Sequence, residues 1–276
     1  MAQSSNPDYS AFREFERAGY SKVAANYSGE TARVTSQVND RILDAVGAVA
    51  GMRLLDVACG PGRLSASAAG RGCAVTGIDF AAPMIEIAKR TCPTGTFHVG
   101  DAESLPFEPG QFDVVVCSLG LLHFSNPEQA IGEVKRVLVP RGLYAFTCWV
   151  PPARNPFMGL LFGAVQKHGT LDVPLPSGPP LFRFGEPAEC ERTLRECGFE
   201  IVQTTELAMN WDFESAEHVV PGVLGATARL SPLLSLQTPE QRERIEQAIT
   251  EGARAYGVGG RVAIPAPMTL AVARKP

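Results

Sequence analysis

The chain has no cysteine pair at metal-binding or redox spacing and no long apolar stretch. Its seven cysteines include no CxxC pair, and several lie inside apolar runs, so we expect free thiols in a reducing compartment. No uninterrupted apolar stretch approaches the roughly 20 residues that a membrane-spanning helix needs. The first twenty residues lack the apolar core of a signal peptide. These absences predict a cytoplasmic protein without a membrane span.

An excess of charge of one sign is also missing. The net charge is −4, from 25 basic and 29 acidic residues, and no long run of like charge occurs. Such a chain has no electrostatic preference for nucleic acid or an anionic membrane. The 276 residues, 45% of them hydrophobic, are enough to bury a core without disulfides or metal ions. The sequence leaves both a monomer and a homo-oligomer open.

Short apolar runs alternate with helical patterns through the middle of the chain. This alternation predicts an α/β fold with a doubly wound parallel sheet and helices on both faces. The expected strands are 53–58, 73–79, 96–99, 112–117, 143–149, 199–207 and 268–273. The expected helices include one ending near residue 46, then 64–69, 82–91, 127–138, 187–197, 219–236 and 240–256.

A glycine-rich turn follows the first predicted strand. In the segment LLDVACGPGRL, Gly60 and Gly62 remove the Cβ atoms that would keep a ligand away from the backbone. A dinucleotide fingerprint needs a third glycine where Ser65 stands, so that fingerprint fails. Asp56 would repel a pyrophosphate, but it suits a ligand that is cationic at an amino-acid end. By itself, the turn is equally compatible with a plain strand-to-helix connection.

Acidic residues follow the next two strands. Asp79 lies 19 positions after Gly60, where an acid can accept from both hydroxyls of a ribose, although alone it would more often cap a helix. Asp101 follows the third strand and can accept from the exocyclic amine of adenine, beside the backbone amide of Ala102, or cap a turn. Two apolar residues near Asp79 could pack on adenine, Phe80 and Met84. All of these positions meet at the carboxyl edge of the predicted sheet, where open α/β sheets bind ligands.

In this order and spacing, the motifs resemble those of class I S-adenosylmethionine-dependent methyltransferases, most of all the UbiE or type 11 branch that acts on small molecules. The resemblance covers roughly residues 20–150 and rests on LLDVACGPG, GIDF, GDAESLPF, FDVVVCSLGLLHF and EVKRVLVPRG. It implies a seven-stranded Rossmann-like sheet. It also implies S-adenosylmethionine as the cofactor and S-adenosylhomocysteine as the product.

The resemblance also implies roles for the matched residues. It places Asp56 and the glycine turn along the methionine portion of the cofactor and Asp79 on the ribose. The segment from Tyr20 to Tyr27 is similar to the family's aromatic-xxx-Ala-xx-Tyr lid, although Tyr20 stands where a tryptophan is frequent. The predicted cofactor-binding residues are Tyr27, Asp56, Ala58, Gly60, Gly62, Asp79, Phe80, Met84, Asp101, Ala102, Glu103, Ser118 and Leu119.

Methyl transfer is an in-line displacement, so such a protein must align the acceptor and exclude water. A general base is needed only if the acceptor loses a proton. His123 ends the fourth-strand motif and is the candidate base or substrate hydrogen-bond partner; the alternative is a satisfied residue at a helix entrance. His98 lies inside the third predicted strand and is expected to be structural, whereas His168 and His218 lie in the insertions and could face substrate. The four histidines together form no metal-ligand pattern. We therefore expect no metal.

The chain is expected to form one domain, residues 1–276. Residues 1–50 would be a helical lid, 51–150 the cofactor-binding core, and 151–185 and 211–262 two insertions that form the acceptor pocket. The apolar residues expected there are Phe157, Met158, Leu161, Phe162, Phe182, Phe184, Trp211, Phe213 and Leu224. With few lysines or arginines among them, they fit a small, partly hydrophobic acceptor better than nucleic acid. For most of them, the expected role is to pack the insertions together.

The leading hypothesis is methyl transfer to carbon or oxygen of a small acceptor in quinone-like or secondary-metabolite biosynthesis. A second hypothesis keeps the fold and cofactor but replaces transfer by a cyclisation or rearrangement, for which the cofactor-binding residues would be the same. A third is an NAD(P)-dependent reductase on a similar sheet. Asp56, Ser65 and Asp101 count against it.

Overall fold

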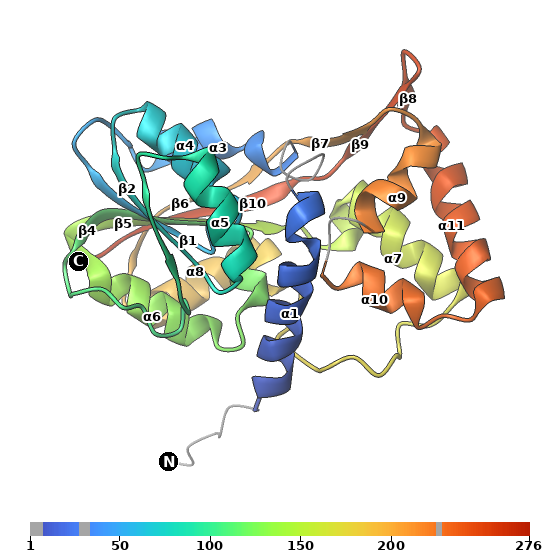
Figure 1. Cartoon of the computed structure of the whole chain (residues 1–276), viewed down its shortest axis with the longest axis horizontal. Coiled ribbons are helices and arrows are strands. Elements are labelled where there is room, and N and C mark those ends of the chain that lie inside the picture. The colour runs from blue at the N-terminus through green and yellow to red at the C-terminus, as the bar shows by residue number, and fades with distance from the viewer. Residues whose placement is uncertain (1–7, 28–33, 225–227) are drawn as a thin grey trace.

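The computed structural model describes residues 8–27, 34–224 and 228–276, with only the backbone of residues 25–27. Its core is a seven-stranded sheet in the order β3-β2-β1-β4-β5-β10-β6 (Figure 1). The strands are β1 Arg53–Val57, β2 Ala74–Asp79, β3 Thr96–Val99, β4 Phe112–Ser118, β5 Leu138–Trp149, β6 Glu200–Leu207 and β10 Met268–Arg274. Their positions confirm the predicted strands and the α/β fold.

One strand runs against the others. β1 to β5 pair in parallel, whereas β10 pairs antiparallel with both β5 and β6. The parallel pairing of β1 to β5 confirms the prediction from the alternating pattern, which gave no direction for the last strand. β10 is nevertheless almost wholly buried, because it lies between two other strands. An apolar run has this composition whichever way the strand runs, so the pattern could not give the direction.

The helices of the sheet begin at the residues that the sequence marks. In α6, Pro127–Val137, the side chain of Asn126 accepts a hydrogen bond from the Gln129 amide and proline occupies the first turn. Helices cover both faces of the sheet, with α3, α4 and α5 on one side and α6 and α8 on the other (Figure 1). Their bounds are α3 Asn39–Ala45, α4 Arg63–Gly70, α5 Ala82–Thr91 and α8 Pro187–Glu196.

Two boundaries near the sheet differ from the predictions. β5 begins at Leu138 instead of residue 143, because the segment expected to be a turn stays in the strand through a register shift against β4. Arg141 takes a left-handed conformation there, and its amide donates to the Lys275 carbonyl. The single helix expected to end near residue 46 is interrupted by a turn at residues 37–38 before α3 begins.

The insertions gather beyond one end of the large sheet, at the right of Figure 1. They comprise α7 Pro156–His168, α9 Val219–Leu224, α10 Leu230–Ser235, α11 Pro239–Arg254 and a small antiparallel sheet, β7 Asn210–Phe213, β9 Arg261–Pro265 and β8 Gly257–Val258. The helix expected over 219–236 is two short helices, since Pro232 fits only a first helical turn. The small sheet was not predicted, although Trp211 and Phe213 are buried alternately with exposed neighbours.

Helix α1, Ser10–Tyr27, lies between the large sheet and the insertions and packs against α5 (Figure 1). All seven cysteines are free thiols, as predicted. Among the described residues, no helix is long and apolar enough to cross a membrane.

Candidate functional site

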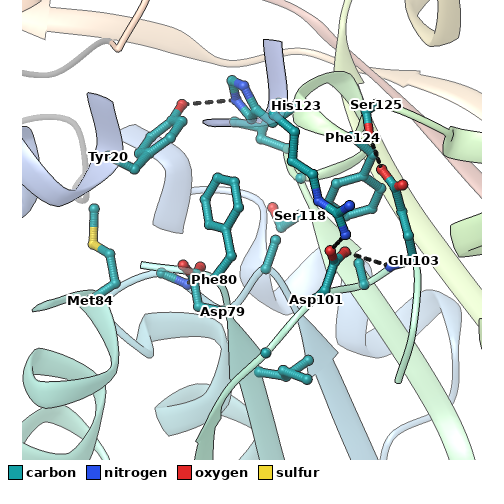
Figure 2. Close-up of a pocket in the computed structure, with 18 residues that line it drawn as sticks. Tyr20, Asp79, Phe80, Met84, Asp101, Glu103, Ser118, His123, Phe124 and Ser125 are labelled. Atoms are coloured by element: carbon teal, nitrogen blue, oxygen red, sulfur yellow. Dashed lines mark hydrogen bonds and ion pairs between the residues drawn. The ribbon is translucent and has the colours of Figure 1, made fainter. Parts of the chain in front are cut away.

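A cavity of about 710 Å³ opens where β1, β2 and β4 end and where the loop after β3 begins. Figure 2 shows Asp79 and Asp101 on its floor and Tyr20 and His123 near each other on its far side. It brings together most of the predicted residues, namely Ala58, Gly60, Asp79, Phe80, Met84, Asp101, Ala102, Glu103, Ser118, Leu119 and His123.

The two glycines of the turn, Gly60 and Gly62, differ in what surrounds their missing Cβ atoms. Gly60 lines the cavity with a φ of +51°, and among the described residues no atom lies within 4 Å of the place a Cβ would take. Gly62 has a φ of +79°, but its missing Cβ would lie 2.9 Å from the Ala88 Cα of α5. Gly60 therefore leaves room on the ligand side, whereas Gly62 lets α4 approach α5 closely.

Replacing Gly62 by alanine is expected to lower the free energy of unfolding by about 2–4 kcal/mol, because the new methyl group meets α5 and the backbone is left-handed. The matched control is Gly47→Ala. Gly47 has a φ of +60° and open space around its Cβ position among the described residues, so only the backbone cost of about 1 kcal/mol remains. Urea unfolding measures both. Equal losses would show that packing against Ala88 is unimportant.

Two non-glycine residues of the cavity are held in left-handed conformations. Ala58 follows β1 with a φ of +54°, and Leu119 follows β4 with a φ of +57°. The Leu119 amide is fixed by donating to the carbonyl and hydroxyl oxygens of Thr147 in β5, at 3.1 and 3.2 Å. Strained backbone of this kind costs of order 1–3 kcal/mol each and is concentrated at ligand sites. Both residues lie at strand ends that form the cavity floor.

Two acids are buried beside the glycine turn. Asp79 accepts from the amides of Gly60 and Ala81, both at 2.9 Å. Burial raises the pKa of Asp79 to about 6, although these two hydrogen bonds lower it. Asp56 accepts from the Ser65 hydroxyl at 2.7 Å. Burial raises the pKa of Asp56 to about 7, the Ser65 hydrogen bond opposes this rise, and the nearby charge of Asp79 adds to it.

Asp56 lines a smaller adjoining pocket of about 440 Å³, which shares Ala58, Gly60 and Ser118 with the first cavity. The two buried carboxylates are costly to ionise in the protein alone, and a bound cation would relieve that cost. S-adenosylmethionine carries an ammonium and a sulfonium group, so these residues fit it. NADH carries a pyrophosphate, which Asp56 would repel.

The carboxylates of Asp101 and Glu103 already make hydrogen bonds and ion pairs within the protein. One oxygen of Asp101 accepts from the Glu103 amide at 2.8 Å, and the other pairs with Arg13 of α1. The Glu103 carboxylate accepts from the Ser125 hydroxyl at 2.7 Å and the Asn126 amide at 2.8 Å. Glu103 therefore fixes the loop before α6 while lining the cavity. An adenine at Asp101 would share its carboxylate with Arg13.

The remaining predicted residues form the cavity walls. Met84 is buried with Ala24 and Ala81, and Tyr20 and Phe80 pack against this cluster. The Ser118 hydroxyl lies 3.2 Å from that of Thr147. The side chain of Tyr27 lies outside the described residues, so its predicted role as a lid stays a prediction.

His123 is hydrogen-bonded at both ring nitrogens to residues of α1. Its Nε2 lies 2.8 Å from the Tyr20 hydroxyl, and its Nδ1 lies 2.9 Å from Glu16 Oε2. The second oxygen of Glu16 accepts from Arg229 Nε, and Arg229 also donates to the Leu122 carbonyl at 2.9 Å. Both predicted alternatives for His123 therefore have support, since it is satisfied and it lines the cavity.

A second apolar cavity, of about 740 Å³, lies against the first. The two share Tyr20, Leu119 and His123 as lining residues. Five of the residues expected in the acceptor pocket line it, Phe157, Met158, Leu161, Phe162 and Trp211. Four others are absent from the lining, Phe182, Phe184, Phe213 and Leu224. Of these, Phe182 packs on Phe162 and Phe213 stacks on Trp211, behind the cavity wall, whereas Phe184 packs on Phe146. His98, His168 and His218 line neither cavity.

Sequence reasoning missed Glu16, Arg13 and Arg229. Glu16 and Tyr20 are four residues apart in a helix, which places them on one face of α1. That spacing was visible in the sequence. The contact with Arg229, 213 positions later, had no signal there. Among the described residues, no group of three or more His, Cys, Asp or Glu side chains could hold a metal ion.

Residues 55–146 match the family model described as a methyltransferase domain. The chain is 33% identical over 168 residues to a ubiquinone biosynthesis O-methyltransferase of Azoarcus, covering 59% of this chain and 70% of that protein. It is 27% identical over 276 residues to the nocamycin O-methyltransferase of Saccharothrix syringae, and the match covers 92% of this chain and 96% of that protein. A demethylmenaquinone methyltransferase of Renibacterium salmoninarum is 40% identical over 116 residues, 42% of this chain and 49% of that one. The chain thus spans about half the length of several curated relatives that it matches.

Solved structures share the fold at low sequence identity. The cyclase SpnF has a TM-score of 0.59 at 20% identity, covering 99% of both chains. The geranyl diphosphate C-methyltransferase of Streptomyces coelicolor, solved with S-adenosylhomocysteine, has a TM-score of 0.51 at 16% identity, covering 89% of this chain and 80% of that one. At such identities the likeness concerns the fold alone.

Proposed function

The chain belongs to the class I S-adenosylmethionine-dependent methyltransferases, and we propose that it transfers the methyl group of this cofactor to an oxygen or carbon of a small, partly hydrophobic acceptor. The observation that carries the proposal is the pair of adjoining cavities with Tyr20, Leu119 and His123 at their common boundary. One cavity has the acids that suit the cofactor, and the other has apolar walls. Transfer requires the two ligands to meet at such a boundary.

The first cavity would hold the cofactor, whose sulfonium makes its methyl carbon electrophilic. Asp79 would bind the ribose hydroxyls while its carboxylate keeps the Gly60 amide in place. Asp56 would face the amino-acid end through the adjoining pocket. Asp101 would accept from the adenine amine, with Ala102 beside the ring. In this proposal residues 51–150 form the cofactor-binding core of a single domain.

The second cavity would hold the acceptor. Phe157 and Trp211 stack with ring centroids 4.3 Å apart in its wall, which favours a flat apolar acceptor body. The insertions supply most of this wall, and the boundary residues exclude water from the reacting atoms. The relatives named for ubiquinone, demethylmenaquinone and nocamycin support a quinone-like or secondary-metabolite acceptor.

The proposal is tested by incubating the protein with trideuteriomethyl S-adenosylmethionine and a panel of hydroquinones, catechols, enols and methylatable carbon acids. We expect one class to acquire the labelled methyl group, with S-adenosylhomocysteine formed in equal amount by mass spectrometry. If the cofactor binds but an acceptor only cyclises or rearranges, the non-methylating alternative is correct. Reduction of a panel member by NADH would favour the reductase.

A further inference from the structure

The helix that covers the cofactor cavity also places a buried acid against His123. Glu16 in α1 is fully buried, yet both of its oxygens are paired, one with His123 Nδ1 at 2.9 Å and one with Arg229. A buried carboxylate is tolerated only when it is paired in this way. Glu14, two residues earlier, is exposed and pairs only with Arg17 among the described contacts. Burial thus singles out Glu16 on this helix.

The charge of Glu16 decides which nitrogen of His123 carries the hydrogen. Burial raises the pKa of Glu16, but the permanently charged guanidinium of Arg229, which donates to its second oxygen, opposes that rise. The carboxylate is therefore ionised at neutral pH and can only accept. Nδ1 must then be the donor, and in the neutral form of the ring Nε2 accepts from the Tyr20 hydroxyl, 2.8 Å away.

Tyr20 stands between His123 and the two ligand cavities. It lines both of them, and while its hydrogen is directed to Nε2, its oxygen can still accept from an acceptor hydroxyl. A phenol or enol in the second cavity therefore reaches His123 through Tyr20. Such hydroxyls lose a proton to a base of moderate strength, which suits an imidazole.

We infer, on the basis of the methyl transfer proposed above, that Tyr20, His123 and Glu16 form a proton relay for a phenolic or enolic acceptor, in which Glu16 is the positioning residue. The O–H bond of the acceptor breaks, its proton passes to the Tyr20 oxygen, and the Tyr20 proton passes to His123 Nε2. The acceptor oxygen forms a bond to the methyl carbon. The carbon–sulfur bond breaks, and its electron pair stays on sulfur as a neutral thioether. The Glu16 carboxylate balances the imidazolium.

The relay depends on where α1 lies. Glu16 and Tyr20 both come from this helix, and Glu16 also ties it to Arg229 of the second insertion. His123 comes from the loop after β4. The base is therefore complete only when α1 covers the cavity, which couples proton removal to exclusion of water.

Glu16→Gln keeps the size of the side chain but removes its charge. With a phenolic acceptor from the panel, we expect kcat to fall about 10–100-fold, while the KM for the acceptor and the Kd for S-adenosylhomocysteine change less than about threefold. Glu16→Asp should recover part of the rate, and Glu14→Gln is the matched control. Tyr20→Phe should also lower kcat. A wild-type rate in Glu16→Gln or in Tyr20→Phe would overturn the relay.

An activity-independent measurement separates this inference from the proposed function. Long-range ¹H–¹⁵N NMR of the imidazole rings, with His123 assigned from the His123→Asn variant, reports which nitrogen is protonated at pH 8. We expect hydrogen on Nδ1 in the wild type and in Glu16→Asp, and a loss of this preference in Glu16→Gln. The same tautomer in Glu16→Gln contradicts the relay even if methyl transfer is observed. The expected tautomers without methylation of any acceptor would contradict the proposed function instead.

Discussion

Replacing His123 by asparagine is expected to lower kcat about 10²-fold or more for an acceptor that must lose a proton. General base catalysis contributes about 10²–10⁴-fold, and an amide cannot take the proton. Asparagine can still donate to Glu16, so the buried carboxylate keeps a partner. We therefore expect the Kd for S-adenosylhomocysteine, measured by calorimetry, to stay within about threefold of the wild type.

His98→Asn is the control for this variant. His98 is exposed on β3 and packs edge-on against Phe107, with ring centroids 5.4 Å apart, away from both cavities. Its replacement should leave kcat unchanged. An unchanged kcat in His123→Asn would mean that the acceptor needs no base, as for an acceptor that is already ionised. His123 would then be the satisfied structural residue that the sequence also allows.

Replacing Asp56 by asparagine is expected to stabilise the unliganded protein at high pH. Burial raises the pKa of Asp56 from 3.8 to about 7 in the folded chain, so the folded state binds this proton more tightly than the unfolded state does. The stability from Asp56 is therefore present below about pH 4 and is lost as the pH rises towards 7. A shift of about three pH units corresponds to about 4 kcal/mol at pH 8.

Asparagine keeps the acceptor for the Ser65 hydroxyl without the buried charge. We expect the free energy of unfolding of Asp56→Asn to exceed that of the wild type by up to about 4 kcal/mol at pH 8, and to match it near pH 4. Denaturant unfolding across this range measures the difference. A wild-type pH dependence in the variant would show that Asp56 ionises without cost. Affinity for S-adenosylmethionine should fall, because the buried charge is what a cationic ligand stabilises.

Asp113→Asn gives the opposite sign and serves as the control. The hydrogen bond from Arg53 lowers the pKa of Asp113 despite an opposing effect of burial, and the Arg53 amide and charge add to the lowering. The contribution of Asp113 is therefore present above its unfolded pKa and is lost at acidic pH. Its replacement should destabilise the protein slightly at pH 8, and this difference should shrink as the pH falls below about 4.

Most of the sheet and of the lining of the first cavity could be predicted because their signals are local. Buried strands such as β1 and β4 are short apolar runs, and Asn126 with Pro127 marks the start of α6. The register from Gly60 to Asp79 reflects one strand–helix–strand unit. In the structure these two residues are joined by a hydrogen bond of 2.9 Å.

What could not be predicted depends on contacts between distant segments. Glu14 and Glu16 look alike in the sequence, yet only Glu16 is buried, because His123 and Arg229 pair with it. Gly62 was expected to face a ligand but faces Ala88, since its direction depends on how α4 packs on α5. The antiparallel direction of β10 depends on the side from which the chain enters the gap between β5 and β6. An apolar run does not encode that direction.

The assignment of the first cavity to S-adenosylmethionine is tested most directly by calorimetric titration of the wild type and Asp79→Ala with S-adenosylmethionine, S-adenosylhomocysteine and NADH. We expect the first two ligands to bind the wild type and NADH not to bind. Loss of charge-assisted hydrogen bonds in Asp79→Ala should weaken cofactor binding by about 1–3 kcal/mol. Binding of NADH alone, or an unchanged affinity in Asp79→Ala, would contradict the assignment.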